Sequence, residues 1–161
     1  VMTIQVIVAI GEALIRAGFK NMMILCCHGG NEFIMEVASR EIRTRGMHCF
    51  CMHGSAGMSK ETDVNDMHAG EGETSMMMYI GDEYYRPEKI MADSKDSLEK
   101  CHALTNEKSS ATQAWVIDDV AVHGVVGDPT LASKEKGEKF LSMSVDEIEK
   151  NLGVIADSMI K

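Results

Sequence analysis

The run of apolar residues from Met22 to Cys27, MMILCC, constrains the fold of this chain more than any other segment. Its side chains do not alternate between polar and apolar, which is typical of a strand covered on both faces in a parallel sheet. The polar turn His28-Gly29-Gly30-Asn31 follows it directly. We therefore predict a strand over residues 21–27 within an α/β domain, with a turn at its carboxyl end.

Helical patterns stand on both sides of this strand. Residues 3–17 and 31–45 carry apolar side chains at helical spacing, and Gly18 and Gly46 are placed to end the two helices. Residues 47–52 predict a second strand, so strand, helix and strand form a right-handed crossover unit. We expect a three-layer α/β/α sandwich with a small, mainly parallel sheet. A parallel sheet would have a strand before the first helix, so we interpret the sequence as the N-terminally truncated, later portion of such a domain.

The second half of the sequence is less regular. We expect a polar loop over residues 55–66 and a helix that begins within 69–75 and ends at Ile80. Residues 84–110 predict irregular structure with one short helix at 94–104, and 114–120 predict a short strand. A final helix is expected over 133–161, with a break near 142–144. The length of 161 residues fits a single domain over residues 1–161.

The charge balance disfavours several classes of partner. The 25 acidic and 16 basic residues give a net charge of -9, which opposes binding to nucleic acids and to anionic membranes. No apolar run approaches the roughly 20 residues of a membrane helix, and the first residues lack the pattern of a signal peptide. Five cysteines without a CxxC pair indicate reduced thiols. We expect a cytoplasmic protein that acts on a small molecule.

The first polar motif is His28-Gly29-Gly30-Asn31, at the end of the predicted buried strand. Open α/β sheets place their ligand crevice at the carboxyl ends of strands. The histidine could bind a metal through one ring nitrogen, and the two glycines would let backbone amides approach a substrate. The alternative is a strand-to-helix turn in which the glycines serve the geometry and the histidine caps the helix.

A second motif, His68-Ala69-Gly70-Glu71-Gly72-Glu73-Thr74-Ser75, lies where the loop should enter a helix. Histidine and carboxylates together suit proton transfer and metal binding. Glu71 and Glu73 are two residues apart on a helix, so at most one should point into a site. Either could instead stabilise the positive N-terminal end of the helix. A third stretch, Gly124 to Pro129 (GVVGDP), predicts a tight turn in which Asp128 bonds to the backbone.

In this order and at these separations, HGGN, HAGExETS and GVxGDPxxAS resemble the creatininase (creatinine amidohydrolase) family. The resemblance covers nearly the whole chain and corresponds to roughly the last two thirds of a typical member. It implies an α/β/α sandwich, a homo-oligomer that is often a hexamer, and a centre of two divalent metals, zinc, manganese or iron. It also implies hydrolysis of a cyclic amide or formamide-type C–N bond by metal-activated water.

The resemblance assigns roles to particular residues. His28 matches a metal-ligand histidine, Glu73 matches a glutamate that binds or supports the second metal, and His68 matches the histidine that transfers a proton to or from the substrate. The candidates for substrate binding are Gly29, Gly30, Asn31 and Glu71. Glu71 is also the second candidate, after Glu73, for a metal-binding carboxylate.

Several positions depart from the family pattern. Creatininase itself has a glutamate ligand where this chain has Gly30, and a tryptophan and a histidine where this chain has Val64 and Met67, which argues against creatinine as substrate. The family's Glu-x-His pair and bridging aspartate have no counterpart in this sequence. Since a hydrolytic zinc usually keeps three protein ligands, we expect the chain alone to bind metal weakly and to be inactive unless another polypeptide completes the site.

Two other classes of function stay open. The chain could be a non-catalytic remnant or assembly subunit that keeps the fold and the oligomer interface. It could also be a flavodoxin-like module that binds phosphate at the HGGN turn. Stoichiometric metal in the purified protein would favour the enzyme, whereas nucleotide binding without metal would favour the phosphate-binding module.

Overall fold

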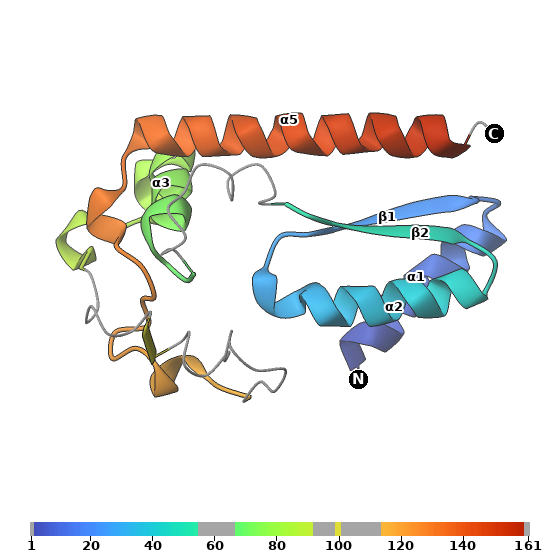
Figure 1. Ribbon diagram of the computed structural model, residues 1–161, viewed down its shortest axis with the longest axis horizontal. Coiled ribbons are helices and arrows are strands. Elements are labelled where there is room, and N and C mark those ends of the chain that lie inside the picture. The colour runs from blue at the N-terminus through green and yellow to red at the C-terminus, as the bar shows by residue number, and fades with distance from the viewer. Residues whose placement is uncertain (1, 55–66, 92–98, 101–113, 160–161) are drawn as a thin grey trace. The chain divides into compact units, whose positions relative to one another are not determined.

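A computed structural model describes residues 2–54, 67–91, 99–100 and 114–159. The chain divides into two compact units (Figure 1). The first comprises residues 1–56 and 147–161, and the second comprises residues 57–146. The single domain inferred from chain length stays a prediction. The expected loop at 55–66 and most of the expected helix at 94–104 lie outside the described residues.

The first unit contains the predicted crossover. Its elements before the final helix are α1 (Met2–Arg16), β1 (Asn21–Cys26), α2 (Glu32–Thr44) and β2 (His48–His53). The two strands are parallel and pair from Asn21 with His48 to Cys26 with His53. The backbone φ angles of Gly18 and Gly46 are +91° and +98°, which favours glycine just after each helix. The elements predicted here from the sequence are confirmed.

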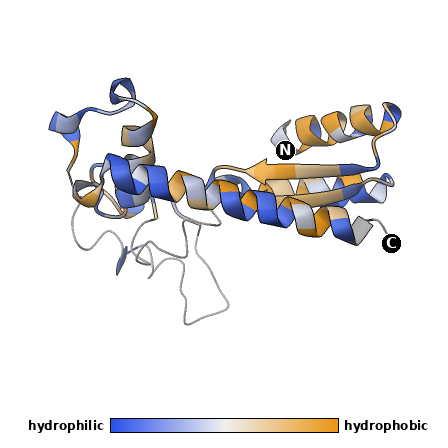
Figure 2. Ribbon diagram, turned by 90° about the horizontal axis from the view of Figure 1, so that it is seen from above, coloured by the Kyte–Doolittle hydropathy of each residue, from blue (hydrophilic) through white to orange (hydrophobic). Residues whose placement is uncertain are grey.

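Three layers build this unit. Figure 1 shows β1 and β2 between α1 and α2 on one side and the end of α5 (Lys134–Met159) on the other. The same strands carry hydrophobic colour along much of their length in Figure 2, as the non-alternating sequence predicts. The chain therefore has the predicted α/β fold with a parallel sheet.

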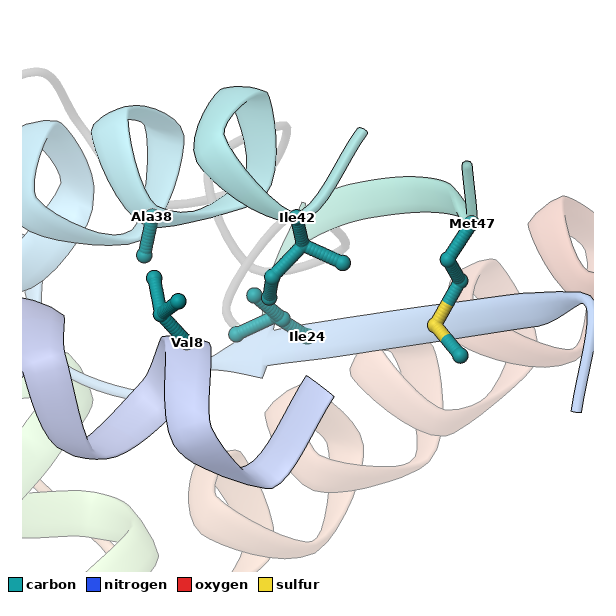
Figure 3. Close-up of a cluster of buried hydrophobic side chains, with 5 residues drawn as sticks. All are labelled: Val8, Ile24, Ala38, Ile42 and Met47. Carbon is teal, nitrogen blue, oxygen red and sulfur yellow. The ribbon is translucent and has the colours of Figure 1, made fainter. Parts of the chain in front are cut away.

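The core of the first unit lies between the helices and the sheet. Figure 3 shows its buried side chains pointing toward one another: Val8, Ile24, Ala38, Ile42 and Met47. Each fully buried large aliphatic side chain contributes about 1.5–3 kcal/mol by removal from water. Gly11 lets α1 approach α2, since a Cβ there would lie 2.7 Å from Cγ1 of Ile42. Partial burial against this core raises the pKa of the Cys49 thiol to about 11.

The second unit is built from α3 (Glu71–Ile80), the first part of α5 and four short 3₁₀ turns. These turns are Asp82–Tyr84, Pro87–Lys89, Ile117–Asp119 and Pro129–Leu131. Val120, Ala121 and Val126 form a small core beside the half-buried Trp115. The predicted helix from the HAGE motif to Ile80 is confirmed.

Two predicted details of this half are wrong. Residues 114–120 contain a 3₁₀ turn instead of a strand, because the Asp119 carboxylate accepts a hydrogen bond from the Val116 amide at 2.8 Å and closes a local turn. The expected break near 142–144 does not occur. Helix α5 is continuous there, with Ser144 buried within it. Among the described residues, no helix has the length and apolar character needed to cross a membrane.

Candidate active site

His28 leaves β1 in an extended conformation and begins the HGGN turn. Its Nδ1 accepts a hydrogen bond from the Gly30 amide at 3.1 Å, which caps the 3₁₀ turn Gly29–Asn31. A Cβ at Gly30 would lie 3.0 Å from Cε1 of His28, so a glycine permits this close approach. In this conformation His28 therefore caps the turn, as the alternative interpretation of the HGGN motif predicts. In a neutral ring whose Nδ1 accepts, the proton lies on Nε2, so metal binding by His28 would require the Gly30 bond to break or the ring to turn over.

The backbone amides of the turn are not equivalent. The amide of Gly30 is taken by His28, and the amide of Asn31 donates to the His28 carbonyl at 3.0 Å. Within the described residues, the Gly29 amide has no hydrogen-bond acceptor. Gly29 is therefore the amide of this turn that a substrate oxygen can reach without displacing a protein group.

A contact between a histidine and a glutamate at the same end of the sheet was not predicted from the sequence. His53 is half-buried, with its Nε2 2.9 Å from Oε1 of Glu32. It lines a cavity of about 270 Å³ together with Glu32, Glu36 and Cys51. The expected parallel pairing of the two strands could have indicated this position. His53 ends β2 directly opposite Cys26, so parallel pairing brings it to the edge of the sheet where HGGN begins. His48, at the opposite end of β2, is exposed.

In the second unit, the backbone of His68 is fixed by the GVVGDP stretch. The His68 amide donates to the Val126 carbonyl at 2.9 Å, and the Val126 amide donates back at 2.8 Å. The imidazole itself is exposed. Ala69, which follows, has a φ of +53°, a left-handed conformation that costs a non-glycine residue roughly 1–2 kcal/mol. The structure thus presents a solvent-accessible imidazole on a constrained backbone.

Both candidate glutamates have local partners at the start of α3. Oε2 of Glu73 accepts a hydrogen bond from the Ala69 amide at 2.6 Å, and Glu71 forms an ion pair with Lys136 of α5. Each carboxylate lies in the first turn of the helix, where its charge also favours the helix dipole. Within the described part of the chain, only one oxygen of Glu73 is used, so its Oε1 stays available to another group.

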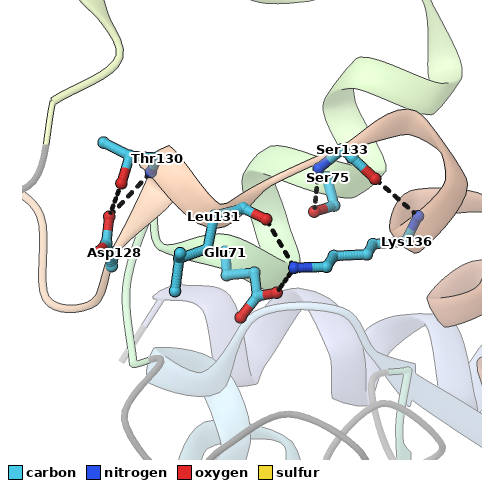
Figure 4. A network of polar contacts seen from close by, with 7 residues as sticks. All are labelled: Glu71, Ser75, Asp128, Thr130, Leu131, Ser133 and Lys136. Carbon is cyan, nitrogen blue, oxygen red and sulfur yellow. Dashed lines mark hydrogen bonds and ion pairs between the residues drawn. The ribbon is translucent and has the colours of Figure 1, made fainter.

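The remaining residues of the two motifs join α3 to α5 (Figure 4). Oγ of the fully buried Ser75 accepts a hydrogen bond from the Ser133 amide at 3.2 Å, and Oγ of Ser133 accepts from the Lys136 amide at 3.3 Å. Lys136 also donates to the Leu131 carbonyl at 2.7 Å. The Ser75 and Ser133 positions of HAGExETS and GVxGDPxxAS are therefore structural.

Asp128 and Asp82 make further polar contacts in this unit. Asp128 accepts hydrogen bonds from the amide of Thr130 at 2.9 Å and from its hydroxyl at 2.5 Å, which confirms the predicted aspartate turn. Lys134 lies 2.5 Å from Asp82 and holds the pKa of that carboxyl below its usual value, while Asp82 raises the pKa of the Lys134 ammonium. This ion pair ties the start of α5 to the turn after α3.

The donors for a metal are divided between the units. His28 belongs to the first unit, and His68 and Glu73 belong to the second. Among the described residues, no group of three or more histidine, cysteine, aspartate or glutamate side chains could hold a metal ion. The described residues of each unit therefore do not by themselves offer the ligand set that a hydrolytic metal needs. The convergence of His28, His68 and Glu73 on one ion stays a prediction.

A parallel β-α-β crossover with a histidine and two glycines at the carboxyl end of its first strand defines an α/β protein, a class in which ligands bind at the carboxyl ends of strands. Residues 2–152 match the family model of creatininase, described as creatinine amidohydrolase. The chain belongs to the creatininase family.

One curated relative and one solved structure are similar to this chain, and the solved structure shows the likeness of the fold. A mycofactocin precursor peptide peptidase from Mycobacterium ulcerans (strain Agy99) is 30% identical over 121 residues, which are 74% of this chain and 43% of the relative. A solved structure from Bacteroides fragilis NCTC 9343, provisionally assigned as a creatinine amidohydrolase, aligns with a TM-score of 0.64 at 24% identity. The alignment covers 91% of this chain and 58% of that protein. The chain thus spans less than half of the curated relative.

Proposed function

We propose that this chain supplies part of the active site of a metal-dependent amidohydrolase that cleaves a C–N bond of a small molecule. The observation that carries the proposal is the exposed imidazole of His68 on a backbone fixed from both sides by Val126. A constrained backbone holds a proton-transfer group in place without loss of solvent access, as general acid–base catalysis requires. Family membership supports the same reaction class.

His28 and Glu73 are the residues of this chain that would hold the metal. The imidazole and carboxylate types suit zinc, manganese or iron, and Oε1 of Glu73 has no competing bond among the described residues. When bound, such an ion lowers the pKa of water toward neutrality and supplies the hydrolytic nucleophile. Two protein ligands are fewer than the usual three, so we propose that the complete centre includes donors beyond these two.

The chain's own groups serve the remaining steps. The Gly29 amide donates a hydrogen bond to the carbonyl oxygen as negative charge develops on it, because this amide has no hydrogen-bond acceptor among the described residues. Protonated His68 then donates its proton to the departing nitrogen, which leaves as a neutral amine. Asn31 and Glu71 are proposed to contact the substrate, although Glu71 must share its carboxylate with Lys136.

The test compares His68→Ala with His48→Ala in an assembly that contains the remaining metal donors. His48 is also exposed but lies at the start of β2, so it is the matched control. Each protein is supplied with zinc, manganese or iron and incubated with cyclic amides, formamides and short peptides. We expect His68→Ala to lower turnover about 10²–10⁴-fold with unchanged metal content, and His48→Ala to leave turnover intact. Equal turnover of the two variants would reject the role of His68.

The second candidate function is a non-catalytic subunit of the same fold. The local bonds of His28 and Glu73 favour it, because each side chain has a structural use without any metal. Metal analysis of the assembly that contains the remaining donors separates the candidates: an enzyme purifies with zinc, manganese or iron, and an assembly with a purely structural subunit does not. We further propose a cytoplasmic homo-oligomer, with a hexamer as the form that the family resemblance implies, to be measured by light scattering coupled to gel filtration.

A further inference from the structure

A large apolar cavity lies in the second unit beside α3. Its volume is about 600 Å³, within the roughly 300–1,000 Å³ typical of small-molecule sites. The described lining residues are mainly apolar and come from α3 and the two 3₁₀ turns that follow it. Among them are Met77, Ile80, Tyr84, Ile90 and Met91.

These apolar side chains are incompletely buried. Ile80 is 55% exposed, Tyr84 is 54% exposed and Met91 is 49% exposed. Large apolar side chains gathered around one concave surface mark a binding site more often than side chains scattered singly over the protein. The three methionines, two isoleucines and two tyrosines of the lining suit an aromatic or branched aliphatic group, because methionine adapts its shape to what it contacts.

Two cations line the same cavity. Arg86 precedes the turn Pro87–Lys89 and Lys89 ends it, and within the described residues neither side chain has a hydrogen-bond or ion-pair partner. Lys134 and Lys136 of the same unit are instead held by Asp82 and Glu71. In a chain whose net charge is -9, two unpaired cations beside an apolar surface favour an anionic group on the ligand.

The cavity lies next to the proposed proton-transfer residue. Ala69 and Val125, the chain neighbours of the paired residues His68 and Val126, both line it. Glu73 is the single carboxylate among the described lining residues, and its Oε2 is already engaged by the Ala69 amide. A ligand in the cavity would therefore end close to the HAGExETS motif.

We propose that this cavity binds the part of the substrate away from the scissile bond: an apolar body of aromatic size that carries a carboxylate facing Arg86 and Lys89. Only the identification of the ligand as the substrate rests on the proposed function. Binding to the cavity needs no metal. The substrate class is thus an N-acyl amide or a cyclic amide that carries an apolar body and, away from the scissile bond, a free carboxylate.

Calorimetric titration of the full chain without added metal tests the binding. The probes are 4-phenylbutyrate, its neutral amide 4-phenylbutyramide and the cation 4-phenylbutylamine, which share one apolar body. We expect the carboxylate to bind about 10-fold or more tighter than the amide, with the amine weakest, and the preference to shrink at high salt. Equal binding of the three probes, or no binding of the carboxylate, overturns the proposal.

Variants locate the binding. Arg86→Gln and Lys89→Gln should each weaken 4-phenylbutyrate about 10-fold or more and leave 4-phenylbutyramide unchanged, whereas Arg86→Lys should restore most of the loss. Met77→Ala should weaken all three probes. Lys20→Gln, an exposed cation of the first unit, is the control and should change none. An Arg86→Gln protein that keeps its far-ultraviolet circular dichroism and its full affinity overturns the assignment.

The experiments distinguish a failure of this binding proposal from a failure of the proposed hydrolase function. Probe binding that depends on Arg86 in a protein without turnover would reject the hydrolase and keep the ligand class. Turnover that depends on His68 but is equal for charged and neutral substrates, in wild type and Arg86→Gln alike, would keep the hydrolase and reject this cavity as its substrate site.

Discussion

The Glu73 carboxylate accepts a short hydrogen bond from the Ala69 amide, at 2.6 Å. This bond spans the left-handed turn at Ala69 and fixes the backbone just after His68. A carboxylate that holds this turn can also bind a metal through its second oxygen. One residue can therefore position the proton-transfer group and ligate an ion, and the two uses of Glu73 do not exclude each other.

The strain at Ala69 gives a stability prediction. Glycine adopts a φ of +53° without the clash that alanine suffers, so Ala69→Gly should raise the free energy of unfolding by about 0.5–1 kcal/mol, after the larger entropy of the unfolded glycine chain is subtracted. The control is Ala13→Gly on the exposed face of α1, where glycine should cost about 1 kcal/mol. Urea unfolding followed by circular dichroism measures both, and a destabilised Ala69→Gly would contradict the strain.

Local contacts were predictable from the sequence, and distant ones were not. The hydrogen bond from the Thr130 amide to Asp128 joins residues two positions apart, so the turn pattern GDPT predicts it. The pair of Glu71 and Lys136 joins residues 65 positions apart, and nothing in either segment alone reveals it. For the same reason the sequence alone could not show that His53 contacts Glu32.

Strands and helices were predicted well where the pattern of hydrophobicity was long. Residues 1–54 alternate between helical spacing and a continuous apolar run, and each element appears within a few residues of its predicted bounds. The segment 114–120 is short, and its two consecutive aspartates, Asp118 and Asp119, favour a local turn over strand pairing. Helix α5 runs through the serines at 142 and 144 because tertiary packing outweighs the modest helix propensity of serine.

The packing of α3 on α5 depends on a glycine in α5. A Cβ at Gly137 would overlap the Ser75 carbonyl oxygen and lie 2.9 Å from Cβ of Tyr79, whereas a Cβ at Gly153 would meet nothing within 4 Å. Gly137→Ala should therefore lower the free energy of unfolding by about 1–3 kcal/mol.

The matched control lies in the same helix. Gly153→Ala should raise the free energy of unfolding by about 0.5–1 kcal/mol, because alanine loses less entropy than glycine in a helix. Urea unfolding of both variants measures the difference in sign. If Gly137→Ala matched Gly153→Ala, the close approach of α3 and α5 would be wrong.

The family motifs are distributed over the two units in an uneven way. HGGN belongs to the first unit, while HAGExETS and GVxGDPxxAS meet in the second through the His68–Val126 bridge and the bond between Ser75 and Ser133. The order of motifs in the sequence was sufficient to indicate the family. It could not show which motif residues serve packing and which remain available for chemistry, because that depends on contacts between segments far apart in the chain.

The metal affinity of the chain tests the consequence of dividing the proposed donors between the two units. Complete structural zinc sites with four ligands gain about 10–16 kcal/mol on binding, so the two donors His28 and Glu73 should give a Kd weaker than about 1 μM. At 10 μM zinc or manganese the free energy of unfolding should then rise by less than about 1.4 kcal/mol. Thermal unfolding with and without metal measures the shift, and equilibrium dialysis measures the Kd.

Substitutions show whether the weak binding uses the expected side chains. His28→Ala should abolish the metal-dependent shift, because its imidazole is the one nitrogen ligand proposed, and His48→Ala should leave the shift unchanged because His48 is exposed at the opposite end of β2. Nanomolar binding that survives His28→Ala would contradict the ligand assignment, since the ion would then be held by donors other than this strand-end histidine. Nanomolar binding that requires both His28 and Glu73 would instead show that the chain completes the centre by itself and would reject the two-donor account.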